Sequence, residues 1–197
     1  MINEQQWLAE YFERYQASLF QTDVVPLLIK LKDWMLQTKA QGGKVIFAGN
    51  GGSAAMASHC AVDFTKNAGV RCINFNEADL ITCFANDYGY ERWLKKAIEY
   101  YADPGDLVIL ISSSGKSPNM VNAARYAVDK GLRLVTFTGF AQDNPLQGLG
   151  QLNFWVNSRA YNVIEMTHHI WLLAVCDLMI GDAELPARQE ERYAVAR

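Results

Sequence analysis

Four serines lie close together in one short segment of the chain, between an apolar run and a proline. They are Ser112, Ser113, Ser114 and Ser117. Hydroxyl groups, a glycine and the free backbone N–H groups at the start of a helix can hold a phosphate without a metal. The alternative is a helix cap without a ligand, in which Ser117 precedes a helix with Pro118 in its first turn. A cap explains one serine and leaves three without a role, so we favour phosphate binding.

A second loop reads Gly49-Asn50-Gly51-Gly52-Ser53 and stands between an expected strand and an expected helix. Its glycines allow backbone N–H groups to turn toward a ligand, and the helix N-terminus adds positive partial charge. An anion or a sugar hydroxyl can dock there, and the alternative is a tight strand-to-helix turn with Ser53 as the N-cap. Because the loop has neither the G-x-G-x-x-G spacing nor the lysine of a Walker A loop, the motif alone leaves both open.

A third polar segment, Asn86-Asp87-Tyr88-Gly89, is expected in a loop between two helical stretches. Its side chains can hydrogen-bond sugar hydroxyls, and taken alone it is also typical of an Asx turn. Asn86 and Asp87 are therefore candidates for substrate binding only in combination with the two loops above.

An α/β framework must position these loops. Apolar β-rich segments are expected at 45–47, 72–75, 107–111, 132–137 and 154–156, and helices at 5–19, 24–39, 54–66, 90–101, 118–130 and 162–180. Continuous apolar strands that alternate with amphipathic helices predict a doubly wound sheet of five parallel strands, covered on both faces. In a flavodoxin-like strand order the loops after the first and third strands, at Asn50 and Ser112, meet in a crevice at the carboxyl ends of the strands.

The length of 197 residues fits a single domain spanning the whole chain. Residues 1–40 are expected to form an antiparallel helical pair outside the sheet, with an apolar stripe that has to pack against other subunits. Residues 182–197 are rich in charge, so we expect a solvated tail there.

Composition excludes several classes of protein. A net charge of −3 argues against direct nucleic-acid binding, and a hydrophobic content of 50% excludes intrinsic disorder. The four cysteines form no C-x-x-C pair, which indicates reduced thiols. No signal peptide is visible, and the longest apolar run, 170–180, is too short to cross a membrane and contains Asp177. We therefore expect a soluble, cytoplasmic protein.

The order G-N-G-G-S, A-N-D-Y-G and I-S-S-S-G-K-S within one βαβ chain resembles the sugar isomerase (SIS) domain family, in particular its phosphoheptose isomerase group. The resemblance implies that a sugar phosphate binds and that the assembly is a homotetramer. It implies that the first loop contacts the sugar through Asn50, Gly51, Gly52 and Ser53. It also implies that Asn86 and Asp87, from the third segment, bind the substrate. The phosphate would lie on Ser112, Ser113, Ser114 and Ser117.

Isomerases of this family also carry a metal and acid/base set, and here the resemblance is incomplete. It places a histidine and an acidic residue of that set at His59 and Asp63, an i, i+4 pair on one helix face. On the last helix, Ile164 and Leu172 stand where the family has a glutamine and a histidine. Neither apolar side chain can bind zinc, so we expect at most a partial zinc site at His59 and Asp63.

Isomerising an aldose to a ketose through an enediol needs a base beside the carbonyl. The remaining candidates are Glu165, Asp63 and the pair His168-His169. Glu165 and His169 are four residues apart and share a helix face, which allows the carboxylate to orient the imidazole. We expect Glu165 to be the catalytic base, with Asp63 second and His169 in support. The alternative for both histidines is a structural role on a packed helix.

Two functions from different classes are compatible with these residues. The first is an aldose-ketose isomerase of the sedoheptulose-7-phosphate isomerase type. The second is a non-catalytic SIS protein that binds a sugar phosphate or, like the replication regulator DiaA, which the chain also resembles, the replication initiator DnaA. The intact glycine and serine loops favour the isomerase.

Overall fold

The computed structural model describes residues 2–20 and 24–183. Five parallel strands form one sheet in the order β2-β1-β3-β4-β5, which confirms the expected flavodoxin-like order. The strands are β1 (Val45–Gly49), β2 (Cys72–Asn74), β3 (Leu107–Ser112), β4 (Arg133–Thr138) and β5 (Leu152–Trp155). The helices are α1 (Glu4–Leu19), α2 (Val24–Ala40), α3 (Gly52–Lys66), α4 (Ala78–Tyr88), α5 (Trp93–Tyr101), α6 (Pro118–Asp129) and α7 (Tyr161–Ile180). The expected tail at 182–197 lies almost wholly outside the described residues.

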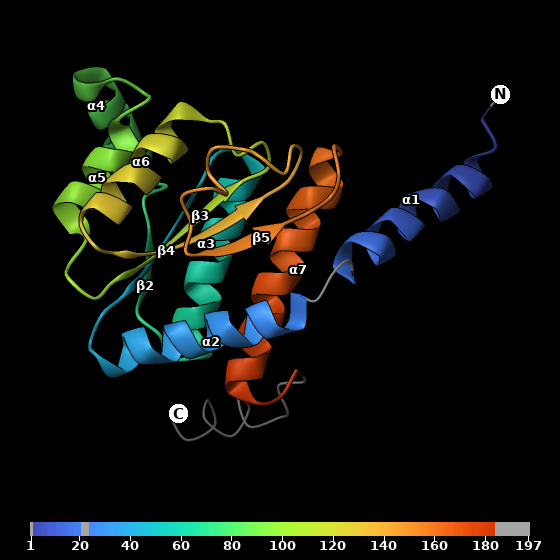
Figure 1. Cartoon of the computed structure of the whole chain (residues 1–197), viewed down its shortest axis with the longest axis horizontal. Coiled ribbons are helices and arrows are strands. Elements are labelled where there is room, and N and C mark those ends of the chain that lie inside the picture. The colour runs from blue at the N-terminus through green and yellow to red at the C-terminus, as the bar shows by residue number, and fades with distance from the viewer. Residues whose placement is uncertain (1, 21–23, 184–197) are drawn as a thin grey trace, which may run out of the picture.

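Two apolar layers hold the sheet between its helices (Figure 1). On one face α2, α3 and α7 bury Leu31, Phe64 and Leu172 against the strands. On the other face α5 and α6 bury Ile98 and Met120. Every residue of β1 and β3 is buried, as the continuous apolar runs predict for strands covered on both sides.

Helix α4 was not expected, and it corrects the interpretation of the Asn86-Asp87-Tyr88-Gly89 segment. Asn86 and Asp87 lie in the last turn of this helix rather than in a loop, and Gly89 ends it with a φ of 85°. The physical reason is that apolar residues recur at helical spacing in this segment and form one face, which packs against the core cluster that α5 also joins. The members of this face are Leu80, Ile81, Phe84 and Ala85.

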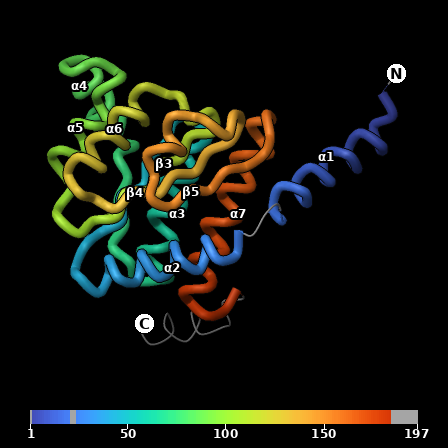
Figure 2. The backbone as a smooth tube through the Cα atoms, in the orientation of Figure 1, coloured from blue at the N-terminus to red at the C-terminus, as the bar shows by residue number. Residues whose placement is uncertain are grey.

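The N-terminal helices exist as expected, but within the described residues they do not form an antiparallel pair. Helices α1 and α2 each pack against α7, and α1 then projects away from the sheet (Figures 1 and 2). The Trp171 indole N–H donates to the Leu19 carbonyl oxygen at 3.2 Å, which fixes the end of α1 to α7. Most of α1 therefore lies free of the domain and exposes its aromatic side chains.

Helix α7 is long and apolar enough to cross a membrane by length and composition alone. It lies against α1, α2 and α3, and its side chains Ile164, Trp171 and Leu172 are buried in the apolar core. One side of this helix thus packs in the apolar core of the domain.

Candidate functional site

One pocket brings together the two loops that the sequence singles out. Strands β1 and β3 are parallel neighbours, with Gly49 paired to Ile111, so the loops that follow them emerge side by side. The pocket has a volume of about 120 Å³. Its lining residues are Asn50, Ser53, Ser112, Ser113, Ser114, Ser117, Tyr161 and Glu165. This is the crevice that the strand order predicts at the carboxyl ends of the strands.

The serine loop offers hydroxyl groups that the protein itself does not use. Ser113 is 5% exposed, and its Oγ is buried without a hydrogen-bond partner in the described part of the chain. Ser117 is the N-cap residue of α6, yet its side chain makes no capping hydrogen bond. The Ser114 Oγ accepts from the Lys116 N–H at 3.3 Å, which leaves its own hydroxyl proton free to donate. A helix cap alone therefore does not explain the loop.

Gly115 shapes this loop. Its φ of 63° is left-handed, and a Cβ at this position would collide with the Asn144 side chain. The Gly115 N–H donates to the Ser112 carbonyl at 3.0 Å, which closes the turn. The four serines of this loop line one pocket at the start of α6, and the N–H groups at a helix start suit an anion.

The glycine loop after β1 is held by a pair of amides. Asn50 and Asn119 donate to each other at 3.0 and 2.9 Å, and the Tyr90 hydroxyl donates to the Asn50 Oδ1 at 3.3 Å. The N-cap of α3 is Gly51, with a φ of 55°, so the alternative in which Ser53 caps the helix is wrong. Ser53 instead lies buried at the wall of the pocket.

Glu165 reaches across from α7 to the glycine loop. A Cβ built on Gly52 would collide with the Glu165 carboxylate, so these two groups are in close contact at the N-terminus of α3. Burial raises the pKa of the Glu165 carboxyl group above its usual value. A carboxylate with a raised pKa beside a polar pocket is the arrangement that general bases require.

His59, Asp63 and His169 form a second polar group between α3 and α7. His59 Nε2 lies 3.1 Å from Asp63 Oδ2, and the rings of His59 and His169 meet edge to face with centroids 4.8 Å apart. Burial, helped by the neighbouring His59, lowers the pKa of His169, although Asp63 opposes the shift. The His169 Nε2 is buried without a partner in the described residues. None of the three lines the pocket of the serine loop.

The residues present do not fit a tetrahedral zinc site. Ile164 and Leu172 are fully buried in the apolar core, at the two positions where the resemblance implies ligands. Across residues 2–20 and 24–183, no group of three or more histidine, cysteine, aspartate or glutamate side chains is arranged to hold a metal ion. His59 and Asp63 supply two ligands, whereas structural and catalytic zinc ions take three or four from the protein.

His168 is a structural residue rather than a catalytic one. It is fully buried, and its Nε2 donates to the Thr138 carbonyl oxygen at 3.0 Å. Burial lowers its pKa from 6.5 to about 4, so the ring is neutral at physiological pH. Its edge packs on Phe137 in β4. The structural alternative therefore holds for His168, while His169 is half-buried against His59 of α3.

Acid should destabilise the fold through His168. The unfolded chain takes up the proton near pH 6.5 but the folded chain only near pH 4, so the free energy of unfolding should fall between these values. The shift corresponds to about 3 kcal/mol. Urea titrations at pH 7 and pH 4.5 should show a smaller loss for His168→Phe, which cannot titrate, than for the unmodified protein. Equal losses would mean that other groups cause the acid sensitivity.

Asn86 and Asp87 lie outside this pocket. The Asn86 amide donates to the Asp87 carboxylate at 2.9 Å, and both residues are exposed at the end of α4. Conversely, Tyr161 lines the pocket although sequence reasoning missed it. The missed signal is the spacing, since Tyr161 precedes Glu165 by one helical turn and shares its face.

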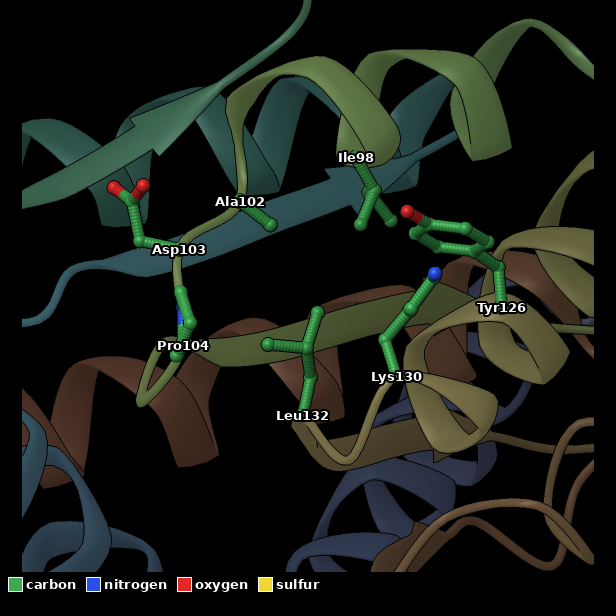
Figure 3. A pocket seen from close by; sticks show the side chains of 7 residues that line it. All are labelled: Ile98, Ala102, Asp103, Pro104, Tyr126, Lys130 and Leu132. Carbon is green, nitrogen blue, oxygen red and sulfur yellow. The ribbon is translucent and has the colours of Figure 1, made fainter.

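A second hollow lies at the opposite ends of the strands, beside the residues that lead into β3 and β4 (Figure 3). Its floor is apolar, and the hydroxyl of Tyr126 and the ammonium of Lys130 stand together at one side. The Asp103 carboxylate already accepts from the Lys44 ammonium at 2.7 Å. The hydroxyl cluster and the raised-pKa carboxylate are confined to the first pocket, which is therefore the better candidate site.

Comparisons with known proteins agree with this geometry. A family model described as "SIS domain" matches residues 10–139. Phosphoheptose isomerase of Burkholderia pseudomallei (strain K96243) is 37% identical over 138 residues, which cover 67% of this chain and 70% of that protein. Phosphoheptose isomerase of Aliarcobacter butzleri is 33% identical over 150 residues, covering 73% and 79%.

Solved structures show the same fold. Phosphoheptose isomerase from Neisseria gonorrhoeae superposes with a TM-score of 0.82 at 24% identity, covering 90% of this chain and 99% of that one. The enzyme from Francisella tularensis gives a TM-score of 0.82 at 22% identity, covering 91% and 98%. Together with the family model, these matches show that the chain belongs to the SIS domain family.

Proposed function

We propose that this protein is a phosphosugar aldose-ketose isomerase of the sedoheptulose-7-phosphate isomerase type. The observation that carries the proposal is the pocket that joins the unpartnered, buried hydroxyl of Ser113 to the Glu165 carboxylate. One group suits a phosphate and the other suits proton abstraction, and they share one cavity. The names of the relatives, which are phosphoheptose isomerases, support the same reaction.

In this proposal the phosphate binds where the serine loop meets the start of α6. Ser112, Ser113, Ser114 and Ser117 donate hydroxyl hydrogen bonds, and the N–H groups of the first turn of α6 complete the cradle. The sugar chain then extends toward the loop of Asn50, Gly51, Gly52 and Ser53. The substrate's reacting carbons thus come to lie beside Glu165.

Glu165 is the proposed base. Its carboxylate removes the proton from the carbon next to the aldose carbonyl while the carbonyl oxygen gains a proton from solvent, which gives an enediol; solvent takes up the proton that the second oxygen loses in the following step. The protonated Glu165 then returns the proton to the former carbonyl carbon, and the second oxygen loses its proton to form the ketose. Asp63 and His169 lie beside His59 between α3 and α7, and His169 follows Glu165 by one helical turn, so we propose both as supporting groups. The described side chains do not fit a metal ion, so the proposed proton transfers use the protein's own groups.

The binding half of the proposal is tested by Ser114→Ala and Ser117→Ala. A hydrogen bond to a charged group contributes roughly 1.5 to 3 kcal/mol, so each variant should bind sedoheptulose 7-phosphate about ten- to a hundredfold more weakly. Calorimetry measures the affinity, and thermal unfolding should show no change in stability, since both side chains are only partly buried. Unchanged affinity in both variants would remove the serine loop from the site.

Turnover decides between the isomerase and the second function. Ile164 and Leu172 are buried at two positions where the resemblance implies metal ligands, and this loss favours a non-catalytic role. A panel of aldose and ketose phosphates, assayed beside a pull-down with a DnaA-type initiator, separates the two. Tight sugar-phosphate binding with no turnover, or capture of the initiator, would support the regulator.

We further propose that the protein is a cytoplasmic homotetramer. Helix α1 and its C-cap residue expose Trp7, Phe12 and Phe20, with 49%, 63% and 80% of their surface accessible, and a chain of this size rarely leaves so many aromatic side chains uncovered. All four cysteines are free thiols, which suits a reducing compartment. Light scattering at micromolar concentration should give the mass of four chains, and a strict monomer would contradict the assembly.

A further inference from the structure

Tyr161 lines the candidate pocket, and 58% of its surface is exposed, so its hydroxyl is accessible to a ligand. We infer that this phenol is a phosphate-binding group that acts together with the serine loop. The inference rests on the proposed function, because it assumes that the pocket receives a sugar phosphate.

The place of Tyr161 follows from the order of the strands. Glu165 contacts Gly52 in the loop after β1, while Tyr161 packs on Phe140 just after β4, with ring centroids 5.0 Å apart. Strand β3 lies between β1 and β4, so the serine loop emerges between these two contacts. The first turn of α7 therefore crosses the pocket, with Glu165 at the β1 side and Tyr161 at the β4 side, next to the serines.

Phe140, on which Tyr161 packs, follows a residue that is hydrogen-bonded to the serine loop. The Gly139 N–H donates to the Ser113 carbonyl oxygen at 2.9 Å, and the next residue is Phe140. The Phe140 N–H in turn donates to the Ser158 carbonyl oxygen at 2.9 Å, three residues before Tyr161. These two bonds tie the phosphate loop, Phe140 and the start of α7 into one unit.

Phe140 is also strained. Its φ of 55° is the only positive φ of a non-glycine residue in the described chain. A left-handed conformation costs free energy for a residue with a Cβ, and such strain persists where the surroundings enforce it, often at ligand sites. Here the strained residue supplies the ring against which Tyr161 packs. We read the strain as what fixes the phenol at the rim of the pocket.

The chemistry of the phenol suits a phosphate. A tyrosine hydroxyl donates one hydrogen bond, and donation to a phosphate oxygen is charge-assisted. The preceding residue, Ala160, is the N-cap of α7 and has no polar side chain to offer. Tyr161 is therefore the side chain at the start of α7 that can reach the anion with a hydroxyl.

The test measures dissociation constants of the full chain for two probes, sedoheptulose 7-phosphate and inorganic phosphate. Tyr161→Phe keeps the ring and removes the hydroxyl, so both probes should bind roughly ten- to a hundredfold more weakly. Phe140→Leu keeps an apolar side chain but removes the ring contact, so it should weaken both probes by a smaller factor. Tyr101→Phe, on α5 and outside the pocket, is the matched control and should leave both constants unchanged.

Each outcome is decisive. Unchanged affinity in Tyr161→Phe, with weakened binding in Ser114→Ala, would overturn the role of Tyr161 and leave the proposed function intact. Weaker binding of the sugar phosphate alone would place the phenol on the sugar and overturn the phosphate role. Wild-type affinity in Phe140→Leu would overturn the part assigned to Phe140. If the unmodified protein binds neither probe, the proposed function itself fails.

Discussion

Glu165→Gln should lower kcat by about 100- to 10,000-fold, the range that general base catalysis contributes, and leave sugar-phosphate affinity nearly unchanged. Glutamine keeps the shape of the side chain but cannot accept a proton from carbon. Because the proposed phosphate-binding groups are the serine hydroxyls, which the substitution leaves in place, the loss of the Glu165 charge should not weaken binding. Steady-state assays with calorimetry on the same preparations measure both quantities.

The pH profile of the unmodified enzyme gives a second check on Glu165. Burial raises the pKa of Glu165, and the base must be deprotonated to act. The acid-side decrease in kcat/KM should therefore occur at a higher pH than the ordinary pKa of a glutamate would give. Glu77→Gln is a suitable control, because that exposed carboxylate at the start of α4 makes no capping hydrogen bond. Full activity in Glu165→Gln would mean that Glu165 is not the base, and Asp63 would be the next candidate. Stoichiometric zinc in the purified protein would contradict the interpretation that His59 and Asp63 supply only two ligands.

The framework and the two loops after β1 and β3 could be predicted because simple sequence patterns determine them. Strands buried on both faces need continuous apolar runs, and parallel strands bring the loops at their carboxyl ends together. From those two rules the loops at Asn50 and Ser112 were expected in one crevice, and the structure places them there. Ile164 and Leu172, whose apolar side chains cannot bind zinc, are buried in the core of the domain.

Other features depend on contacts that a sequence pattern does not show. The partnership of Tyr161 with Phe140 requires the backbone of Phe140 to adopt a left-handed conformation, which no local rule predicts for phenylalanine. The roles of His168 and His169 diverge because one points into the core and the other toward α3. The position of α1 depends on its contact with α7, which is distant in sequence.

Gly52→Ala should lower kcat on the order of 100-fold with little loss of stability. The added Cβ would collide with the Glu165 carboxylate, which must move, and a displacement of about 1 Å at a reacting group can cost this much. Gly52 lies in the first turn of α3 without a left-handed φ, so alanine is otherwise compatible with the backbone. Thermal unfolding and steady-state kinetics together separate the displacement of Glu165 from a general loss of structure.

A double-mutant cycle shows whether Gly52 acts through Glu165. If the glycine matters because it gives the carboxylate room, Gly52→Ala should have almost no further effect on kcat in a Glu165→Gln background, since the base is already lost. Gly148→Ala is the matched control, because its Cβ would meet only the Pro145 carbonyl oxygen at an ordinary 3.8 Å. Additive losses in the double variant would mean that Gly52 serves the substrate directly, through the close approach of its backbone to the sugar, and not through the position of the base.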